Sequence, residues 1–222
     1  MKRGKAVRKS TGSKSTNKKE KVLEQLNLNH PLEKILLSIG VIVLLFMATS
    51  ARLHDSSAFD TIDAKEYINS YKDLAVLEMH RSGIPASIIL AQGIHESNSG
   101  KSTLAKLANN HFGIKCKSYW VGKTYFHKDD DYKNGKLIES CFRAYDSAVQ
   151  SYVDHSNFLM TSKNYESLFK YDSFDYESWA HGLKRCGYAT DPTYTNKLIK
   201  IIEELELYQY DYEENPLHTL SK

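Results

Sequence analysis

The sequence predicts a mainly helical α+β fold with a small β-hairpin lobe, preceded by a single transmembrane segment. Three observations support this prediction: apolar residues at helical spacing between cap signals, short β-prone segments at residues 112–145, and an uncharged apolar run at residues 35–51. Once the termini are set aside, about 150 of the 222 residues remain, which is enough for one domain with its own core.

Residues 1–34 form a basic polar tail. The chain has a formal net charge of only +3, yet its positive residues crowd into the first two dozen positions: Lys2, Arg3, Lys5, Arg8, Lys9, Lys14, Lys18, Lys19 and Lys21. A segment with so little to bury should be disordered. Alone it could be a nucleic-acid tail, but the apolar run that follows favours a cytoplasmic tail, and no nucleic-acid partner is expected.

Residues 35–51 predict a transmembrane signal anchor, because a helix of about 17 uncharged residues rises about 25 Å, just enough for a hydrocarbon core. Basic residues precede this run and few follow it, so the N-terminus should lie in the cytoplasm and the rest of the chain should be exported. Ala48-Thr49-Ser50 could serve as a cleavage site. The basic region is longer than signal peptides usually carry, which favours a retained single-pass anchor in the cell membrane.

A polar linker at residues 52–59 leads into a domain expected at residues 60–207. Asp63 and Glu66 predict a capping box for a first helix that stops at Gly83. Pro85 predicts the start of a second helix, because the missing N–H of proline is harmless in the first turn.

The segment at residues 112–145 has the texture of short strands. Asn134-Gly135 separates two strand-like runs and predicts a hairpin.

Helices are expected again after the hairpin. Ser147 with Gln150 predicts a capped helix start, and Gly187 predicts the end of the next helix. Asp191-Pro192 predicts the N-cap and first position of a last helix. Residues 208–222 are an acidic and polar C-terminal tail, expected to fray from Gln209 onward.

Glu96 is the most informative single residue, because it ends the apolar stretch 84–96 and a Ser-Asn-Ser-Gly turn follows it. In a helix, Ile88, Gln92 and Glu96 share one face, so the carboxyl group emerges where a buried helix meets a loop. Partial desolvation there raises the pKa of a carboxyl group, and a protonated glutamic acid can act as the general acid of a glycosidase. The alternative is a solvated glutamate at a helix end.

Four blocks of sequence change the balance between these two readings. They are AQGIHESNSGKS at residues 91–102, NNHFGIK at 109–115, FRAYDS at 142–147 and GYATDPTY at 187–194. In this order and spacing they resemble the bacterial N-acetylglucosaminidase family, glycoside hydrolase family 73-like, which includes flagellar muramidase-type hydrolases and autolysins. The resemblance covers residues 60–207.

This resemblance implies a lysozyme-like fold and a peptidoglycan hydrolase, an endo-β-N-acetylglucosaminidase that cleaves the β-1,4 bond after N-acetylglucosamine in glycan strands. It also places the catalytic acid on the glutamate of the Glu-Ser-x-x-Gly motif, here Glu96. No cofactor is implied.

A second carboxylate is expected to face Glu96 across the cleft, either to activate water or to stabilise the oxocarbenium-like transition state. The family often carries a glutamate shortly before an Asn-Gly-type turn, and here an aspartate run stands in its place. Alignment points to Asp131, with Asp130 nearly equal and Asp129 the third member. Three solvated acids on a loop are the alternative, and Glu139 is a weaker candidate. Inverting, retaining and substrate-assisted mechanisms all stay open.

Several aromatic and polar residues are expected around the cleft. Tyr188 matches a family tyrosine close to the acid and is expected to belong to the catalytic site, although a packing role is the alternative. Asn110 and Phe112 are expected to line sugar subsites. Trp120 and Tyr125 offer faces on which sugar rings could stack, while a core position is equally compatible with their spacing.

The three cysteines lie in the part of the chain expected to be exported. Cys116 and Cys141 flank the hairpin and could form a disulfide in an oxidising compartment. Cys186 is expected to be a buried free thiol. The histidines follow no zinc-ligand spacing, so no metal is expected.

Two other function classes stay open. A lytic transglycosylase shares the helical body and a lone glutamate but leaves a 1,6-anhydro end on the glycan. A non-catalytic, membrane-tethered wall-binding module could keep the cleft without turnover. For each class the domain is expected in the periplasm or outside the cell, and the cysteine pair favours the periplasm.

Overall fold

The computed structural model describes residues 60–133 and 135–219. The predicted tail, membrane segment and linker at residues 1–59 lie outside this part of the chain. None of the helices in the described ranges is both long and apolar enough to cross a membrane.

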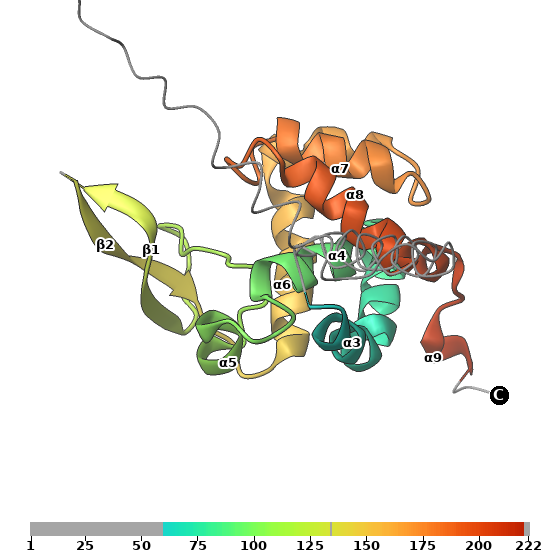
Figure 1. Ribbon diagram of the computed structural model, residues 1–222, viewed down its shortest axis with the longest axis horizontal. Coiled ribbons are helices and arrows are strands. Elements are labelled where there is room, and N and C mark those ends of the chain that lie inside the picture. Colours follow the sequence, from blue (N-terminus) through green and yellow to red (C-terminus); the bar gives the residue numbers. More distant parts are fainter. Residues whose placement is uncertain (1–59, 134, 220–222) are drawn as a thin grey trace, which may run out of the picture. The chain divides into compact units, whose positions relative to one another are not determined.

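The described chain is a mainly helical α+β domain, as predicted. Its elements in order are α3 (Thr61–Ser82), α4 (Ala86–Ser97), α5 (Thr103–Ala108), β1 (Thr124–Lys133), β2 (Lys136–Arg143), α6 (Ala148–Thr161), η1 (Lys163–Lys170), α7 (Tyr176–Arg185), α8 (Tyr194–Glu204), η2 (Leu207–Tyr212) and α9 (Pro216–Thr219). Figure 1 shows α4 among the other helices, with the hairpin of β1 and β2 projecting to one side of them. This arrangement is consistent with a lysozyme-like fold.

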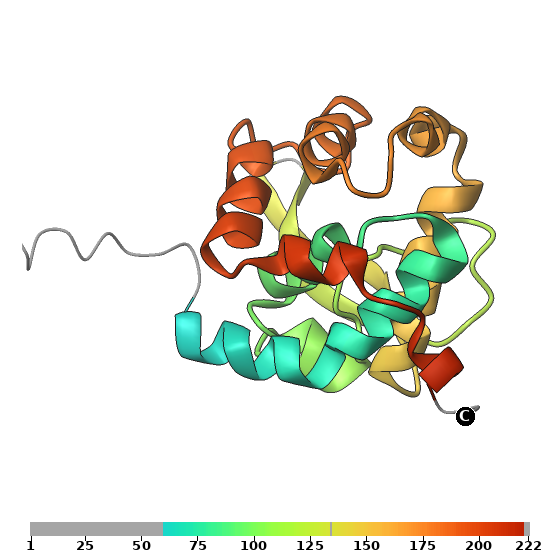
Figure 2. The ribbon, with the colours of Figure 1, turned by 90° about the vertical axis from the view of Figure 1, so that its right-hand side faces the viewer.

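The helical body is built around α4. Every residue of α4 from Ala86 to Ile94 is buried, and α3, α7, α8 and η2 pack against it. A helix that is apolar on all sides is stable only where neighbouring elements cover it completely. Although η2 lies near the end of the chain, it packs against both α3 and α4 (Figure 2).

The first helix begins earlier than predicted. Asp60 is the N-cap of α3, and its carboxylate accepts hydrogen bonds from the backbone N–H groups of Ile62 and Asp63. Asp63 therefore lies in the first turn, where a carboxylate interacts favourably with the helix dipole. The predicted stop at Gly83 is confirmed, since this glycine takes the left-handed conformation with φ of 80°.

The predicted hairpin is confirmed. β1 and β2 pair antiparallel, and Lys133 pairs with Lys136 on either side of the two-residue turn that contains Gly135. Gly135 has φ of 73°, which is the conformation that an Asn-Gly turn requires. The register shifts between Lys128 and Tyr132, so an irregularity interrupts the ladder at the aspartate run.

Two of the other predicted helix boundaries hold and one is wrong. Ser147 caps α6 by accepting a hydrogen bond from the Gln150 N–H, and Gly187, at φ of 79°, follows α7 as predicted. The last helix starts at Tyr194 rather than at Pro192. Asp191 accepts hydrogen bonds from the N–H and hydroxyl of Thr193 and closes a local turn, and the helix begins after this turn.

The expected fraying from Gln209 is wrong for η2. Leu207 and Asp211 are both buried, and Asp211 accepts hydrogen bonds from the backbone N–H of Ser87 at 2.7 Å and from its hydroxyl at 2.6 Å. A carboxylate at this point satisfies an N–H group at the start of α4 that has no partner within the helix. The C-terminal segment therefore holds one end of the central helix, and Glu96 lies at the other end.

Candidate active site

Glu96 lies in the last turn of α4, where the buried helix reaches a loop. Asn98 ends the helix in the left-handed conformation. The hydroxyl of Ser97 donates to the carbonyl of Gly93 and accepts from the N–H of Gly100 at 2.7 Å, so the turn is tied back to the helix. The predicted position of Glu96, on the same face as Ile88 and Gln92, is therefore realised.

A cavity of about 300 Å³ opens beside Glu96. Its walls combine the acid with aromatic and basic groups: Phe112, Lys115, Lys117, Phe158, Tyr165 and Tyr188 are among the lining residues. Aromatic faces suit the apolar faces of sugar rings, and polar groups among them suit the hydroxyl groups. The cavity can therefore hold a sugar next to a carboxyl group.

Tyr194 makes a direct contact with the acid. Its hydroxyl donates to Oε1 of Glu96 at 2.9 Å, and its side chain is buried. Burial, followed by the negative charge of Glu96, raises the pKa of Tyr194 well above its ordinary value. This phenol therefore stays protonated and acts as a hydrogen-bond donor at neutral pH.

Tyr188 lines the cavity next to the acid, which is the position that the resemblance implied. Its ring stacks on Tyr194 with centroids 5.8 Å apart, and its hydroxyl donates to the carbonyl of Phe112 at 3.4 Å. Burial, and then the charge of Glu96, raise the pKa of Tyr188 well above its ordinary value. Tyr188 therefore faces the cavity as a neutral phenol.

Phe112 contributes to the cavity wall as predicted, although only 3% of its surface is exposed. Its ring stacks on His155 with centroids 3.9 Å apart and planes 15° apart. This packing connects the cavity wall to the buried face of α6.

The prediction that Asn110 lines a sugar subsite is wrong. Its side chain is 1% exposed, and its amide N–H groups donate to the carbonyls of Ile114 and Arg143. Its carbonyl oxygen accepts from the N–H groups of Phe112 and Ile114. All of its main hydrogen-bonding positions are used within the protein, so Asn110 shapes the loop of the cavity wall and has none left for a sugar.

Trp120 and Tyr125 are not among the residues that line this cavity. The ring of Trp120 lies against the guanidinium of Arg143, 4.5 Å from the ring centroid, and its N–H donates to the carbonyl of Lys123. Tyr125 lies on β1 opposite Phe142. Both residues belong to the base of the hairpin lobe, so the stacking role predicted for them is not realised in this cavity.

The aspartate run that includes Asp129, Asp130 and Asp131 lies within β1, at the register shift described above. The backbone is extended here, so these aspartates do not lie on the loop that was given as the alternative. Glu139, the weaker candidate, is exposed on β2 opposite Lys128.

Cys116 and Cys141 form the predicted disulfide, which closes a loop with a sequence separation of 25. The N–H of Cys116 also donates to the carbonyl of Cys141 at 2.8 Å. The bond fixes the segment with Lys115 and Lys117, which lines the cavity, to strand β2. Cys186 is a free thiol as predicted, but it is half-buried rather than buried.

Within residues 60–133 and 135–219, no cluster of three or more His, Cys, Asp or Glu side chains has the arrangement of a metal site.

The residues that sequence reasoning missed are Tyr194, Gln92 and His155. Tyr194 ends the block GYATDPTY, and Gln92 lies one helical turn before Glu96, so both stood beside recognised positions. His155 had no local signal, because it meets Gln92 only through the packing of α6 against the rest of the body.

The sequence profile of the glucosaminidase family, described as mannosyl-glycoprotein endo-beta-N-acetylglucosaminidase, matches residues 72–207. The exo-glucosaminidase LytG of Bacillus subtilis is 32% identical over 198 residues, which cover 82% of this chain and 68% of that protein. The peptidoglycan hydrolase FlgJ of Pseudomonas aeruginosa is 32% identical over 152 residues, covering 66% of this chain and 38% of that protein.

Solved structures show the same likeness. A peptidoglycan hydrolase mutant from Sphingomonas sp. A1 is 31% identical with a TM-score of 0.57, covering 65% of this chain and 96% of that one. An N-acetylmuramoyl-L-alanine amidase from Staphylococcus aureus is 31% identical with a TM-score of 0.62, covering 71% of this chain and 46% of that one.

The chain spans only 38% and 50% of two FlgJ proteins that it matches, from Pseudomonas aeruginosa and Vibrio parahaemolyticus. The family profile nevertheless covers more than half of the chain, including the helix that carries Glu96 and both cavity tyrosines. The chain therefore belongs to the glucosaminidase family.

Proposed function

We propose that this protein is a glycoside hydrolase, an endo-β-N-acetylglucosaminidase that cleaves the β-1,4 bond after N-acetylglucosamine in peptidoglycan glycan strands. One observation carries the proposal: the carboxyl group of Glu96 borders a cavity lined by aromatic rings, at the end of a helix that is buried from Ala86 to Ile94. Membership of the glucosaminidase family supports the substrate class.

In this proposal Glu96 is the general acid. It protonates the glycosidic oxygen while the bond to the anomeric carbon breaks, and the leaving sugar departs as an alcohol. Tyr188 borders the same space as a neutral phenol and can hydrogen-bond the sugar at the cleavage point. Phe112 and Tyr165 supply aromatic surface next to these groups.

The second carboxylate is assigned to Asp131 or Asp130. Either would activate a water molecule or stabilise the positive charge that develops on the sugar ring. Their place at an irregularity of β1 supports the assignment, because register shifts re-aim side chains and are frequent next to active sites. Substrate assistance by the N-acetyl group is the alternative if neither aspartate contributes.

We also propose that residues 35–51 anchor the protein in the cell membrane with the N-terminus in the cytoplasm. The domain would then act in the periplasm, or on the outer surface of a cell with one membrane. Its supports are the uncharged apolar run and the basic residues before it. Formation of the Cys116–Cys141 disulfide is in keeping with an oxidising compartment.

Product analysis tests the activity directly. The full chain is incubated with purified peptidoglycan, and the soluble fragments are analysed by mass spectrometry before and after borohydride reduction. Hydrolysis leaves reducing N-acetylglucosamine ends, a lytic transglycosylase leaves 1,6-anhydro ends, and a wall-binding module releases nothing.

The size of the products distinguishes internal from terminal cleavage, which matters because the relative LytG is named an exo-glucosaminidase. Fragments of several disaccharides at early times support an endo-enzyme. Release of small saccharides alone would contradict it. Glu96→Gln, incubated in parallel, controls for contaminating hydrolases.

A further inference from the structure

A chain of buried hydrogen bonds runs from α6 to the proposed acid. His155 Nε2 lies 3.2 Å from Oε1 of Gln92, the Gln92 Nε2 lies 2.9 Å from the Tyr194 hydroxyl, and that hydroxyl lies 2.9 Å from Glu96 Oε1. His155, Gln92 and Tyr194 are each at most 1% exposed. Three elements, α6, α4 and α8, thus meet in one polar line inside an apolar core.

The direction of each hydrogen bond in this chain is determined by chemistry. The amide oxygen of Gln92 can only accept, so Nε2 of His155 must carry a proton and donate it. The amide nitrogen of Gln92 can only donate, so the Tyr194 oxygen accepts from it. The single O–H of Tyr194 is then free to donate to Glu96.

His155 is neutral, as a single proton on Nε2 requires. Burial lowers the pKa of His155 to about 3, so the ring is neutral and carries one proton. With that proton on Nε2, the Nδ1 atom is a bare lone pair, and it is buried without a hydrogen-bond partner among residues 60–133 and 135–219. Burial of an unpaired lone pair costs free energy, and the hydrogen bond from Nε2 to Gln92 offsets part of this cost.

We propose that His155 and Gln92 are positioning residues, which act through Tyr194 to orient the carboxyl group of Glu96. Because Oε1 accepts the tyrosine O–H, the proton of the neutral acid sits on Oε2. That places the transferable proton on the oxygen that the tyrosine does not occupy. After the transfer, the same O–H stabilises the carboxylate that remains. This inference rests on the proposed role of Glu96 as the acid.

If every hydrogen bond in this series ran in the reverse direction, the effect on the ionisation of Glu96 would be the opposite. If the proton of His155 moved to Nδ1, the Gln92 amide would have to turn over, and Tyr194 would donate to Gln92. The tyrosine oxygen could then only accept, so it would favour the protonated form of Glu96. The two directions therefore predict opposite changes when the tyrosine hydroxyl is removed.

Other titratable groups surround the acid and must be held constant in a test. Tyr188 and Tyr165 line the cavity, as do Lys115 and Lys117 from the loop after α5. His95 precedes the acid on α4, and its pKa is lowered by burial and then by Lys197. None of these groups is altered by the substitutions below.

The test follows the ionisation of Glu96 directly, in the full chain. Glutamate labelled with ¹³C at the side-chain carboxyl is incorporated, the Glu96 signal is identified by its loss in Glu96→Gln, and its shift is followed against pH. In Tyr194→Phe the carboxylate loses its donor, so the titration midpoint should move to higher pH by about one unit. The alkaline limb of the activity profile should move in the same direction.

Three further variants test the inner residues. His155→Phe removes the donor to Gln92 and should shift the midpoint in the same direction as Tyr194→Phe, while His155→Gln keeps an N–H at the position of Nε2 and should restore it. Gln92→Met interrupts the series of hydrogen bonds with little change of side-chain volume. It replaces Tyr194→Phe in the test if that variant does not fold.

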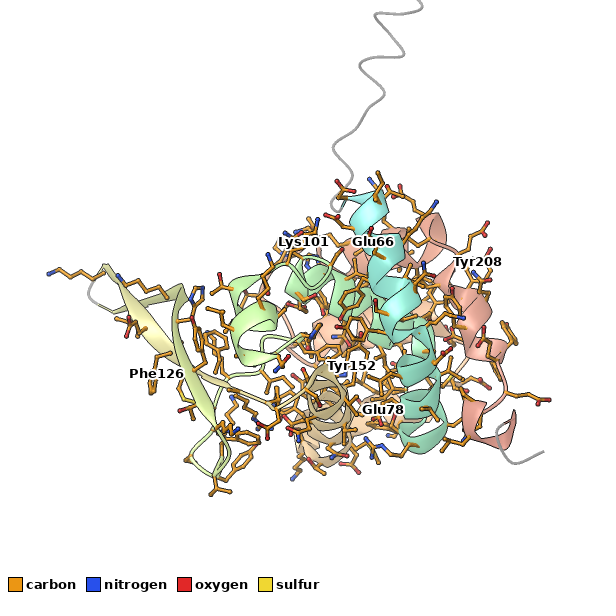
Figure 3. The ribbon with its side chains drawn as sticks, turned by 90° about the horizontal axis from the view of Figure 1, so that it is seen from below. Glu66, Glu78, Lys101, Phe126, Tyr152 and Tyr208 are labelled. Atoms are coloured by element: carbon orange, nitrogen blue, oxygen red, sulfur yellow. A yellow bond between two sulfur atoms is a disulfide. The ribbon has the colours of Figure 1, made fainter. Side chains whose placement is uncertain are left out.

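Tyr152→Phe is the matched control. Its hydroxyl is equally buried and donates to Tyr67 at 2.8 Å, in a separate network that continues to His111. Figure 3 shows Tyr152 in the middle of the helical body. This variant should lose stability but leave the Glu96 midpoint unchanged.

The outcomes separate this inference from the proposed function. An unchanged midpoint in Tyr194→Phe, or one that moves to lower pH, overturns the inference even if the enzyme is active. An inactive wild type, or an active Glu96→Gln, overturns the proposed function but leaves the titration of Glu96 measurable. An upward shift in both Tyr194→Phe and His155→Phe, with recovery in His155→Gln, supports the inference.

Discussion

The hydroxyl of Tyr194 donates a hydrogen bond to Oε1 of Glu96 at 2.9 Å, across a sequence separation of 98. It joins the first turn of α8 to the last turn of α4. This hydrogen bond orients the carboxyl group of Glu96 at the wall of the cavity, and a general acid needs such a fixed orientation toward the bond that is cleaved.

The substitution Glu96→Gln should abolish glycan hydrolysis and leave the fold nearly intact. Glutamine can still accept from Tyr194 but has no acid proton to give, so activity should fall by at least about a hundredfold. Release of fragments from purified peptidoglycan measures the loss, and circular dichroism confirms the fold. Activity within tenfold of the wild type would remove Glu96 from the proposed role.

Single replacements of the aspartates in β1 should have unequal effects. Only one carboxylate can face the bond that is cleaved, so Asn at Asp131 or at Asp130 should cost activity heavily, while Asp129→Asn should cost little. The three variants are compared by turnover on the same substrate. If the triple variant cleaves glycan normally, substrate assistance replaces the carboxylate pair.

Asp211 should make stability depend on pH in a defined direction. Burial raises the pKa of Asp211 from 3.8 to about 6, even though the bonds from Ser87 lower it. The folded state therefore binds the proton more tightly than the unfolded state. The contribution of this group to the free energy of unfolding should decrease as the pH rises from 4 to 6 and should stay constant above pH 6. A shift of this size corresponds to about 3 kcal/mol.

Asp211→Asn isolates this contribution, because it removes the titration and leaves every other group in place. The unfolding free energy of the wild type minus that of the variant, measured with urea, should decrease as the pH rises from 4 to 6. A difference that is constant over this range would show that Asp211 titrates at its ordinary pKa.

Loss of the Cys116–Cys141 disulfide should destabilise the domain. With a sequence separation of 25, the chain-entropy estimate for closing the loop is about 3 kcal/mol. Denaturant unfolding of Cys141→Ser should show this loss. A reductant should lower the free energy of unfolding of the wild type toward that of the variant. Cys186→Ser is the control, since Cys186 is a free thiol. Equal stability of Cys141→Ser and the wild type would contradict the prediction.

Gly93→Ala should strain the centre of α4. A methyl group at this position would lie 2.5 Å from the Tyr67 hydroxyl, so overpacking should cost about 1–3 kcal/mol. Tyr67→Phe removes the obstructing oxygen, and the double variant should therefore lose less stability than the sum of the single variants. Strict additivity in thermal or urea unfolding would show that the helix accommodates the methyl group elsewhere.

The features that the sequence alone predicted correctly are local. Gly83 and Gly187 follow helices because glycine takes the left-handed conformation at little cost, and Gly135 lies in the hairpin turn for the same reason. Glu96 was placed at the end of a buried helix because the apolar residues before it are contiguous. In each case neighbours in the chain determine the conformation, so the signal can be read without knowing the fold.

Tertiary structure decided which groups surround the acid. Nothing local links His155 to Gln92, Tyr194 to Glu96 or Asp211 to Ser87, since sequence separations of 63, 98 and 124 lie between these partners. Asn110 was expected to line a sugar subsite, but its side-chain amide is hydrogen-bonded to four backbone groups of the protein. A hydrogen-bonding side chain takes whichever partners burial leaves available, and burial is a property of the assembled helices.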